Sequence, residues 1–433
     1  MKNIILLFLV FYFSINSNAQ NLSELLAKSK GGYKISGEIK NMQDTTVILA
    51  YYFGGKQYAS DTTNIINGRL TFSGENALDG GIYLLVLPDG KYFELIISEQ
   101  HFSFVTDKNN LVSSMKFQNS KENTAFYEYL NYITEKQKEV SPLKDKQANA
   151  KSDSEKEKLQ SEISKVDDAV LVYRNSFYKK YPDVFFSKII RATTDIVIPE
   201  TPLDDTGKPK ENFQFYYYKK HFWDNMDFSD SRMLRTPIFF NKMDQYLEKL
   251  TPKHPDSIIV SADLLVEQSR ANKKIFQYVV SHITSTYERS KIMGMDAVFV
   301  HMVEKYYMNG ECDWVKEKQL EKIIERANRI SPNMIGKKPP NLVFKDTLDR
   351  YHSLYHLAAD YTLLFFYDPD CGHCNTEAPK VKAVCDSLSG SGIDIKVFAV
   401  TTEFDVEKWK EFIHKHNTGN WINVGDIQFD DEG

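Results

Sequence analysis

Cysteine is scarce in this sequence: its 433 residues include only four, namely Cys312, Cys371, Cys374 and Cys385. A scaffold held together by disulfides carries many more cysteines in a much shorter chain, so the sequence excludes that class of protein. Against so low a background, the pair at C-x-x-C spacing stands out as a candidate functional motif.

Positive charge is also not concentrated anywhere along the chain. The formal net charge is -5, and residues of both signs are interspersed. Proteins that bind nucleic acids neutralise phosphates with a basic stripe or patch, which is missing here. We therefore predict that no nucleic acid is a partner.

Long apolar runs are absent as well. The longest, Ile4–Phe13, is too short to cross a bilayer, because a transmembrane helix needs roughly 20 apolar residues. Lys2 precedes this run, and the small residues Ser17 and Ala19 follow it, which is the layout of a secretory signal peptide. We predict a signal peptide over residues 1–19, cleaved near Ala19, no transmembrane segment and a periplasmic location. The alternative is a short buried N-terminal helix.

Residues 31–120 have the pattern of a small all-β sandwich. Tyr33, Ile35 and Ile39 alternate with polar or small residues, as in a half-buried strand. Two later apolar runs are joined by Pro88-Asp89-Gly90, a sequence that favours a tight turn. No cluster of chemically active residues occurs in this module.

Residues 121–330 predict an all-α module. One apolar seam recurs at spacings of three and four and favours an antiparallel helix pair; it consists of Leu159, Ile163, Val166, Val170, Tyr173 and Phe177. The proline-rich segment 198–213 predicts a loop. The aromatic segment 213–230 favours buried packing, with a carbohydrate platform as the alternative, and His301 is interpreted as a core histidine.

Residues 335–433 alternate strands with helices, which predicts an α/β domain built on βαβ units. The apolar run over 361–367 is typical of a parallel strand that is buried on both faces. A helix, a second apolar strand over 394–400 and another helix containing Trp409, Phe412 and Ile413 follow. The predicted fold class is therefore multidomain: an all-β sandwich, an all-α domain and an α/β domain.

The C-x-x-C motif falls where the first of these strands passes into a helix. The start of a helix carries free N–H groups and a partial positive charge, so a thiolate at Cys371 would be stabilised and its pKa lowered. Cys374 lies one turn further on, on the same side of the helix. Such a thiol can attack a mixed disulfide formed by Cys371 and release the client.

Three neighbouring residues are expected to tune this dithiol. A protonated His373 would favour the thiolate, whereas the negative charge of Asp370 would oppose ionisation of Cys371. Glu377, on the next turn, is a candidate proton carrier, with an ordinary exposed carboxylate as the alternative. Pro379 should kink the helix, because it removes one backbone hydrogen bond.

The segment DPDCGHCNTEAP resembles the active-site segment of thioredoxin-fold thiol–disulfide oxidoreductases, in particular their exported ResA/TlpA-like branch. That branch carries C-x-x-C-x-x-E-x-P, which is matched here by Cys371, Cys374, Glu377 and Pro379. The resemblance implies that Cys371 is the exposed nucleophile, that Cys374 is the resolving thiol and that Glu377 handles protons. The Gly-His dipeptide is similar to that of protein disulfide isomerases, which leaves the direction of exchange open.

Two further segments, YYYKKHFWDNMDFSDSRMLRTP and FVHMVEKYYMNGECDW, resemble a helical module of uncharacterised function. Together with the β module it precedes thioredoxin-like domains in many exported Bacteroidota proteins. The resemblance thus covers nearly the whole chain, although only the dithiol segment implies an activity.

The thioredoxin fold also implies a cis-proline facing the dithiol, followed by a hairpin and a last helix. No proline follows Pro379 in this sequence. We therefore expect a C-terminally truncated thioredoxin-like domain, or one whose sheet is completed by something else, with an open strand edge and exposed apolar faces.

The prediction is an exported thiol–disulfide oxidoreductase whose partners are protein thiols or disulfides and a membrane-bound redox donor. Its expected site residues are Cys371, Cys374, Glu377 and His373, and we expect no cofactor and no metal. One alternative is a non-enzymatic envelope binding module with a vestigial dithiol domain. The other is a zinc site in which Cys385 and His414 or His416 supplement the dithiol.

Overall fold

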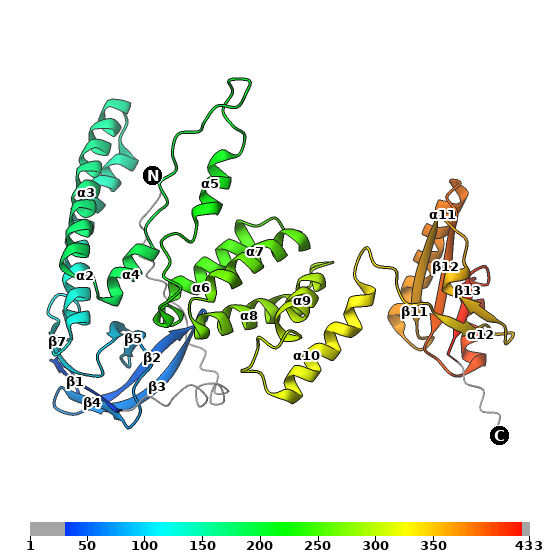
Figure 1. Cartoon of the computed structure of the whole chain (residues 1–433), viewed down its shortest axis with the longest axis horizontal. Helices are drawn as coiled ribbons and strands as arrows, with labels where there is room; N and C mark the ends of the chain where they lie inside the picture. Colours follow the sequence, from blue (N-terminus) through cyan, green and yellow to red (C-terminus); the bar gives the residue numbers. More distant parts are fainter. Residues whose placement is uncertain (1–30, 427–433) are drawn as a thin grey trace. The chain divides into compact units, whose positions relative to one another are not determined.

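The computed structural model describes residues 31–426, so the predicted signal peptide lies outside the described residues. The chain divides into two compact units, with the boundary between Ile324 and Glu325 (Figure 1). No helix in residues 31–426 is both long and apolar enough to span a bilayer.

The first unit begins with two four-stranded sheets, ordered β4-β1-β7-β8 and β3-β2-β5-β6. Their strands are β1 (Tyr33–Lys40), β2 (Thr45–Phe53), β3 (Lys56–Ile65), β4 (Arg69–Gly74), β5 (Gly81–Val86), β6 (Tyr92–Ile97), β7 (His101–Asp107) and β8 (Lys116–Gln118). Phe93 of one sheet meets Phe104 of the other edge to face, with ring centroids 5.4 Å apart. The two sheets therefore pack face to face, as the predicted sandwich requires.

The helix α2 (Lys121–Asn149) covers the free edge of β6. Asn123 donates to the carbonyl of Ile96 and accepts its N–H, both at 2.8 Å. The hydroxyl of Tyr127 donates to the carbonyl of Glu94 at 2.9 Å. Because an edge strand exposes unpaired backbone groups, these side chains replace the hydrogen bonds that a further strand would make.

Helices make up the rest of the first unit. They are α2 (Lys121–Asn149), α3 (Asp153–Lys180), α4 (Phe185–Ala192), α5 (Phe213–His221), α6 (Pro237–Asp244), α7 (Pro255–Ser269), α8 (Lys273–Glu288), α9 (Asp296–Met302) and α10 (Glu317–Ile330), which crosses the unit boundary. Short 3-10 or π turns are η1 (Ser231–Arg235), η2 (Gln245–Lys249) and η3 (Val303–Tyr307), and a further one, η4 (Ser331–Asn333), falls in the second unit. The predicted helical middle region is thus confirmed.

The helices α2 and α3 form the antiparallel pair that the apolar seam predicts. Lys180 near the end of α3 binds Glu128 near the start of α2 at 2.8 Å. At the other end of the pair, Gln147 donates to Gln160 at 3.0 Å. Three seam residues are buried and the other three half-buried; the buried ones are Leu159, Ile163 and Phe177.

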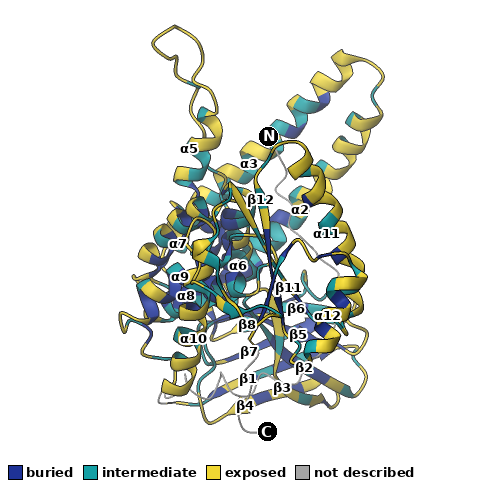
Figure 2. Cartoon of the chain, turned by 90° about the vertical axis from the view of Figure 1, so that its right-hand side faces the viewer, coloured by how far each residue is buried: buried dark blue, intermediate teal, exposed yellow. Residues whose placement is uncertain are grey.

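The aromatic segment 213–230 divides into two parts. Phe222, Trp223 and Phe228 are buried, as predicted. The prediction is wrong for α5, which contains no buried residue, and Tyr216 is 64% exposed (Figure 2). The aromatic residues of α5 do not form a single stripe, so the helix has no apolar face to bury.

One buried carboxylate connects the sheets with the helices. Glu122 of α2 accepts the backbone N–H groups of Phe185 (2.9 Å) and Phe186 (2.7 Å) at the start of α4. It also accepts the hydroxyl of Ser98, which follows β6. Burial raises the pKa of Glu122, although these donors and the nearby Arg232 act in the opposite direction.

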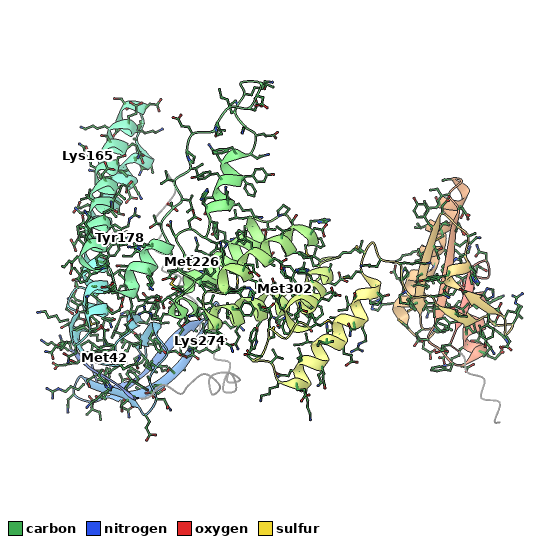
Figure 3. The ribbon with its side chains drawn as sticks, in the orientation of Figure 1. Met42, Lys165, Tyr178, Met226, Lys274 and Met302 are labelled. Carbon is green, nitrogen blue, oxygen red and sulfur yellow. The ribbon has the colours of Figure 1, made fainter. Side chains whose placement is uncertain are left out.

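The tip of the β2–β3 hairpin also packs tightly against the helices. Gly54 and Gly55 both have positive φ, and a Cβ on Gly55 would lie 2.5 Å from the ring of Phe240. On the loop between β4 and β5, Asp79 binds Arg235 of η1 at 2.7 Å and Lys274 of α8 at 3.0 Å. Lys274 is labelled in Figure 3. Sheets and helices therefore share one continuous junction.

The second unit is a five-stranded sheet with helices, ordered β10-β9-β13-β12-β11. Its elements are β9 (Val343–Lys345), β10 (Tyr351–Ser353), η5 (Leu354–His356), β11 (Tyr361–Tyr367), α11 (Gly372–Gly390), β12 (Ile395–Thr401), α12 (Val406–Lys415) and β13 (Ile422–Gly425). The strands β11, β12 and β13 are parallel, and β9 is antiparallel to β13. Trp409 and Phe412 of α12 are buried against one face of the sheet. The predicted α/β domain is confirmed.

One expectation about this sheet is wrong. The strand β11 is not buried on both faces: only Tyr367 is buried, and Phe366 is 55% exposed. The segment that contains β9 and η5 covers Phe398 and Val400 of β12, but β11 lies at the edge of the sheet among the described residues. The helix α11 continues through Pro379 to Gly390.

Candidate active site

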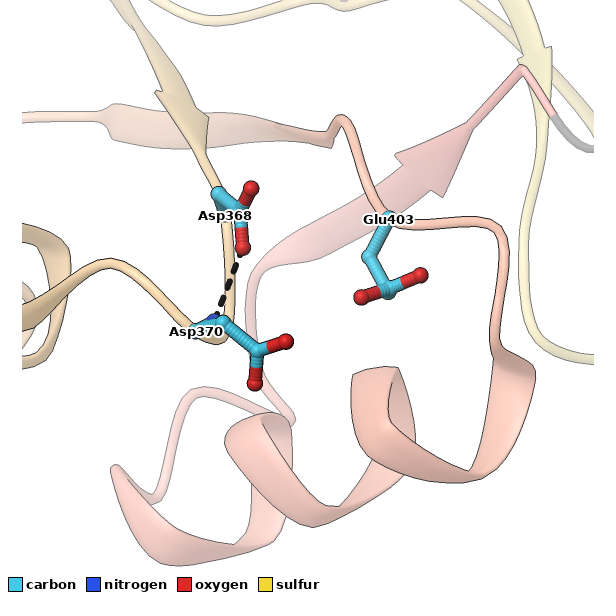
Figure 4. A group of neighbouring side chains, drawn as sticks. All are labelled: Asp368, Asp370 and Glu403. Carbon is cyan, nitrogen blue, oxygen red and sulfur yellow. Dashed lines mark hydrogen bonds between the residues drawn. The ribbon is translucent and has the colours of Figure 1, made fainter.

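The dithiol lies on the turn between β11 and α11. The backbone N–H of Cys371 donates to the carbonyl of Asp368 at 3.0 Å. The carboxylate of Asp368 accepts the backbone N–H of Asp370 at 2.8 Å and closes the same turn (Figure 4). Aspartate favours the first position of such a turn and proline, here Pro369, the second. The local sequence therefore builds the turn that places Cys371 at the start of α11.

Cys371 is the N-cap residue of α11, with an extended backbone. Its Sγ accepts the backbone N–H of Cys374 at 3.4 Å, and the residue is half-buried with a free thiol. Hydrogen bonds lower the pKa of Cys371; the largest contribution comes from the thiol of Cys374, followed by the backbone N–H groups of Cys374 and His373. Donors at a helix start stabilise a thiolate in this way.

Cys374 has the opposite character. It packs against the core formed by α11, α12 and the sheet, and its own thiol is also free. Burial raises the pKa of Cys374, with a further increase from the hydrogen bond that it donates to Cys371. The two sulfurs of the motif are thus unequal: Cys371 ionises more readily than Cys374.

Asp368 carries a charge that opposes ionisation of Cys371, and the same effect of Asp370 stays a prediction. The charge of Asp368 raises the pKa of both sulfurs, although the backbone N–H of Asp368 lowers the pKa of Cys374 by a larger amount. Asp370 forms an ion pair with Lys408 of α12, with Nζ and Oδ2 2.7 Å apart. Lys408 therefore compensates part of the charge of Asp370.

Three carboxylates gather beside the dithiol: Asp368, Asp370 and Glu403 have ligand oxygens within 4.8 Å of one another (Figure 4). In the part of the chain that the structure describes, no other set of three acidic, histidine or cysteine side chains has this spacing. The ammonium of Lys408 lies 2.7 Å from Asp370 and 3.8 Å from Glu403. The chain therefore supplies its own cation to this group.

The other two predicted site residues lie on the exposed side of α11. Both Glu377 and His373 are exposed. The carboxylate of Glu377 pairs with Lys380 at 2.8 Å, and its side chain is 53% exposed. His373 contributes its backbone N–H to the Cys371 sulfur. The structure brings His373 to the dithiol through its backbone and records Glu377 in an ion pair with Lys380.

The remaining cysteines are both buried, Cys312 in the first unit and Cys385 in the second. Burial raises the pKa of Cys312 to about 12 and also raises that of Cys385. Cys385 packs in the core of the second unit. Within residues 31–426, neither Cys385 nor His414 or His416 belongs to a group with metal-site spacing. The zinc alternative therefore gains no support.

Sequence reasoning missed Asn375, Glu403 and Lys408. Asn375 forms hydrogen bonds with the loop before Cys371 and with the end of α12. Glu403 and Lys408 lie next to Asp370 although more than thirty residues separate them from it. Only the predicted βαβ arrangement could have suggested that the segment after β12 returns to the end of β11.

Three family models match consecutive parts of the chain. Residues 33–126 and 145–333 match two domains of unknown function, DUF4369 and DUF5106. Residues 335–426 match the AhpC/TSA family. The second unit is thus a thioredoxin-like domain, and the match supports a thiol-based redox role in general terms. A comparison with curated proteins found no match.

Several solved structures are also similar. A thioredoxin-like protein from Bacteroides caccae is 20% identical over 53% of this chain and 83% of its own length, with a TM-score of 0.39. A domain of a possible thiol-disulfide isomerase from Cytophaga hutchinsonii is 38% identical over 23% of this chain and 65% of its own length (TM-score 0.21). A secreted disulfide oxidoreductase from Mycobacterium tuberculosis is 23% identical over 20% and 60%, respectively (TM-score 0.18). The chain spans less than two thirds of the last two.

Proposed function

We propose that this protein is an exported thiol–disulfide oxidoreductase that exchanges disulfides with envelope proteins through Cys371-Gly372-His373-Cys374. The observation that carries the proposal is the inequality of the two sulfurs. Cys371 is half-buried at the start of α11 and has a lowered pKa, whereas Cys374 packs against the core and has a raised pKa. Exchange needs one ionised nucleophile and one thiol held in reserve.

The reducing direction consists of two displacements. The thiolate of Cys371 attacks one sulfur of a client disulfide; the client S–S bond breaks, a Cys371–client disulfide forms, and the other client sulfur leaves as a thiolate and takes a proton from water. Cys374 then loses its proton and attacks Sγ of Cys371. The second client sulfur leaves, and a Cys371–Cys374 disulfide remains. The client has gained two electrons, and the reverse sequence oxidises a client dithiol.

Turnover needs a second redox partner. In the reducing direction this is a dithiol donor, which we assign to a membrane-bound protein; in the oxidising direction it is a disulfide donor. His373 supports the thiolate of Cys371, and Glu377 takes the proton of Cys374 during the second displacement. For this role Glu377 must leave Lys380, its partner at 2.8 Å. A Glu377→Gln variant should therefore slow the second displacement and leave the first unchanged.

Export is assigned to residues 1–19, which have the sequence features of a signal peptide. Cell fractionation should find the full chain in the periplasm with its new N-terminus near Gln20. A chain that lacks residues 1–19 should remain in the cytoplasm. The same distribution of both chains would overturn this assignment.

Thiol trapping tests the exchange reaction. In the full chain, Cys374→Ser blocks the second displacement, so disulfide adducts between Cys371 and client proteins should accumulate and disappear on addition of a reductant. The matched control Cys371→Ser should form none. Insulin reduction and refolding of a scrambled substrate then measure the direction of exchange. A folded Cys374→Ser chain whose Cys371 is alkylated normally but forms no adducts would overturn the proposal and favour a non-enzymatic binding module.

A further inference from the structure

The side chain of Asn375, directly after the resolving cysteine, makes four hydrogen bonds. Its Nδ2 donates to the carbonyls of Pro369 (2.7 Å) and Cys371 (3.1 Å). Its Oδ1 accepts from Nζ of Lys415 (2.8 Å) and from Nε2 of His416 (2.9 Å). One side-chain amide offers two donors and an oxygen with two lone pairs, so its hydrogen-bonding capacity is fully used.

These bonds connect two elements that are distant in sequence. Pro369 and Cys371 belong to the turn that precedes α11, whereas Lys415 and His416 lie at the end of α12. The carbonyl of Cys371 also accepts the backbone N–H of Asn375 at 3.1 Å, the first hydrogen bond of α11. Asn375 thus holds this carbonyl with both its backbone and its side chain.

Holding the Cys371 carbonyl also fixes the direction of its sulfur. The rotation that would move this carbonyl away from Asn375 would also turn the side chain of Cys371 relative to the helix. The Sγ would then lose the backbone N–H of Cys374, which it accepts at 3.4 Å. Hydrogen bonds weaken steeply with angle, so a small rotation is sufficient to lose this donor.

The hydrogen bonds accepted by the oxygen of Asn375 strengthen the hydrogen bonds that its Nδ2 donates. The ammonium of Lys415 polarises the amide, and a polarised amide is a better donor through Nδ2. Burial and the neighbouring Lys415 both lower the pKa of His416, so its ring is neutral at neutral pH. A neutral ring that donates through Nε2 supplies a hydrogen bond without adding a charge.

We propose that Asn375 is a positioning residue for the dithiol, which holds the backbone of Cys371 so that its sulfur stays on the donors at the start of α11. Lys415 and His416 orient this amide from α12. The inference deepens the proposed function, because it names what keeps the nucleophile ready for exchange.

The test is the pH profile of Cys371 alkylation by iodoacetamide, followed by mass spectrometry of the Cys371 peptide in the full-length protein. Asn375→Leu keeps the size of the side chain and removes all four hydrogen bonds. We expect the profile to move to higher pH and the rate at pH 7 to fall about fivefold, the effect of losing one hydrogen bond. Thr376→Val is the matched control, since it removes a side-chain bond to Gly372 on the same turn of α11.

A second variant keeps the test decisive if Asn375→Leu does not fold. Lys415→Met leaves the amide in place and removes its polarising partner, so the profile should move in the same direction by about twofold. A folded Asn375→Leu protein with the wild-type profile would overturn the inference, as would a Lys415→Met profile that does not move. The measurement uses no client protein, so a failure of disulfide exchange would not change its outcome.

Discussion

The first turns of α4 and α11 both donate backbone N–H groups to an acidic side chain, and the two arrangements differ in the exposure of that side chain. At the start of α4, Glu122 accepts two backbone N–H groups and is 3% exposed. At the start of α11, the sulfur of Cys371 accepts the backbone N–H of Cys374, and the residue is only half-buried. The physical resource is the same in both places: free N–H groups and the positive end of a helix dipole.

The difference in burial reverses the effect on ionisation. For Glu122, desolvation is the largest contribution and raises the pKa. For Cys371, hydrogen bonds outweigh desolvation and lower the pKa. At a buried helix start, such as that of α4, the acidic group stabilises the fold. At an accessible helix start, such as that of α11, the ionised group can react with a client.

Cys371→Asp should convert the open helix start into a structural one. Aspartate is a preferred N-cap, so the second unit should gain about 1 kcal/mol in its free energy of unfolding. Exchange should fall to the rate measured without protein, because the nucleophile at the helix start is removed. Insulin reduction and denaturant titration measure the two effects. Cys371→Ser controls for the added charge, and any residual exchange in either variant would place the nucleophile elsewhere.

Glu122→Ala should destabilise the buried start of α4, because it removes the acceptor of two backbone hydrogen bonds. The N–H groups of Phe185 and Phe186 would stay buried without an acceptor, which should cost about 3 kcal/mol of unfolding free energy in the first unit. Denaturant titration of the full chain measures the transition of that unit. Glu128→Ala is the matched control on α2: it removes a surface ion pair with Lys180 and one hydrogen bond from Tyr181, so it should cost only about 1 kcal/mol. Equal losses in the two variants would contradict the comparison.

Because the pKa of Glu122 is raised in the folded chain, its contribution to the unfolding free energy depends on pH. The folded chain binds this proton more tightly than the unfolded chain, so the contribution is present below the unfolded pKa and is lost as the pH rises through the folded pKa. Glu122→Gln should remove that decline in unfolding free energy. Titrations of both proteins at several pH values provide the check, and parallel curves would show that Glu122 contributes nothing to it.

Asp368→Asn should make Cys371 at the start of α11 slightly more reactive. Asparagine keeps the oxygen that accepts the N–H of Asp370 but removes the charge that raises the pKa of Cys371. The pKa of Cys371 should fall further, and alkylation of Cys371 at pH 7 should become about twofold faster. Asp386→Asn, which disrupts the ion pair with Lys382 on the same helix, should leave the rate unchanged. A slower Asp368→Asn reaction would mean that the turn, and not the charge, controls the sulfur.

Much of this site could be predicted from local sequence. The apolar run that ends at Tyr367, the turn after it and the helix that follows together locate Cys371 at a helix start, where the structure has it. These features depend on neighbours in sequence. The same reasoning identified β12 and α12, because the burial of Trp409 and Phe412 follows from their spacing.

The contacts around the site were not predictable in the same way. Asn375 is bonded to His416, and Asp370 to Lys408, across about forty residues of chain. A sequence read one segment at a time gives no indication of which distant charge will compensate Asp370. For the same reason the exposure of Phe366 was missed, since it depends on which segment covers that side of the sheet.

The junction between the β2–β3 hairpin and the helices has a consequence for how the protein comes apart. Asp79 is bound by Arg235 and Lys274, and Gly55 lies against Phe240. The sandwich and the helices are therefore expected to unfold together, although one family match ends near residue 126, between them. Heating should therefore give two unfolding transitions rather than three, and limited proteolysis should give two stable fragments. The sandwich expressed without its helices should be less stable, because its contacts with them are missing.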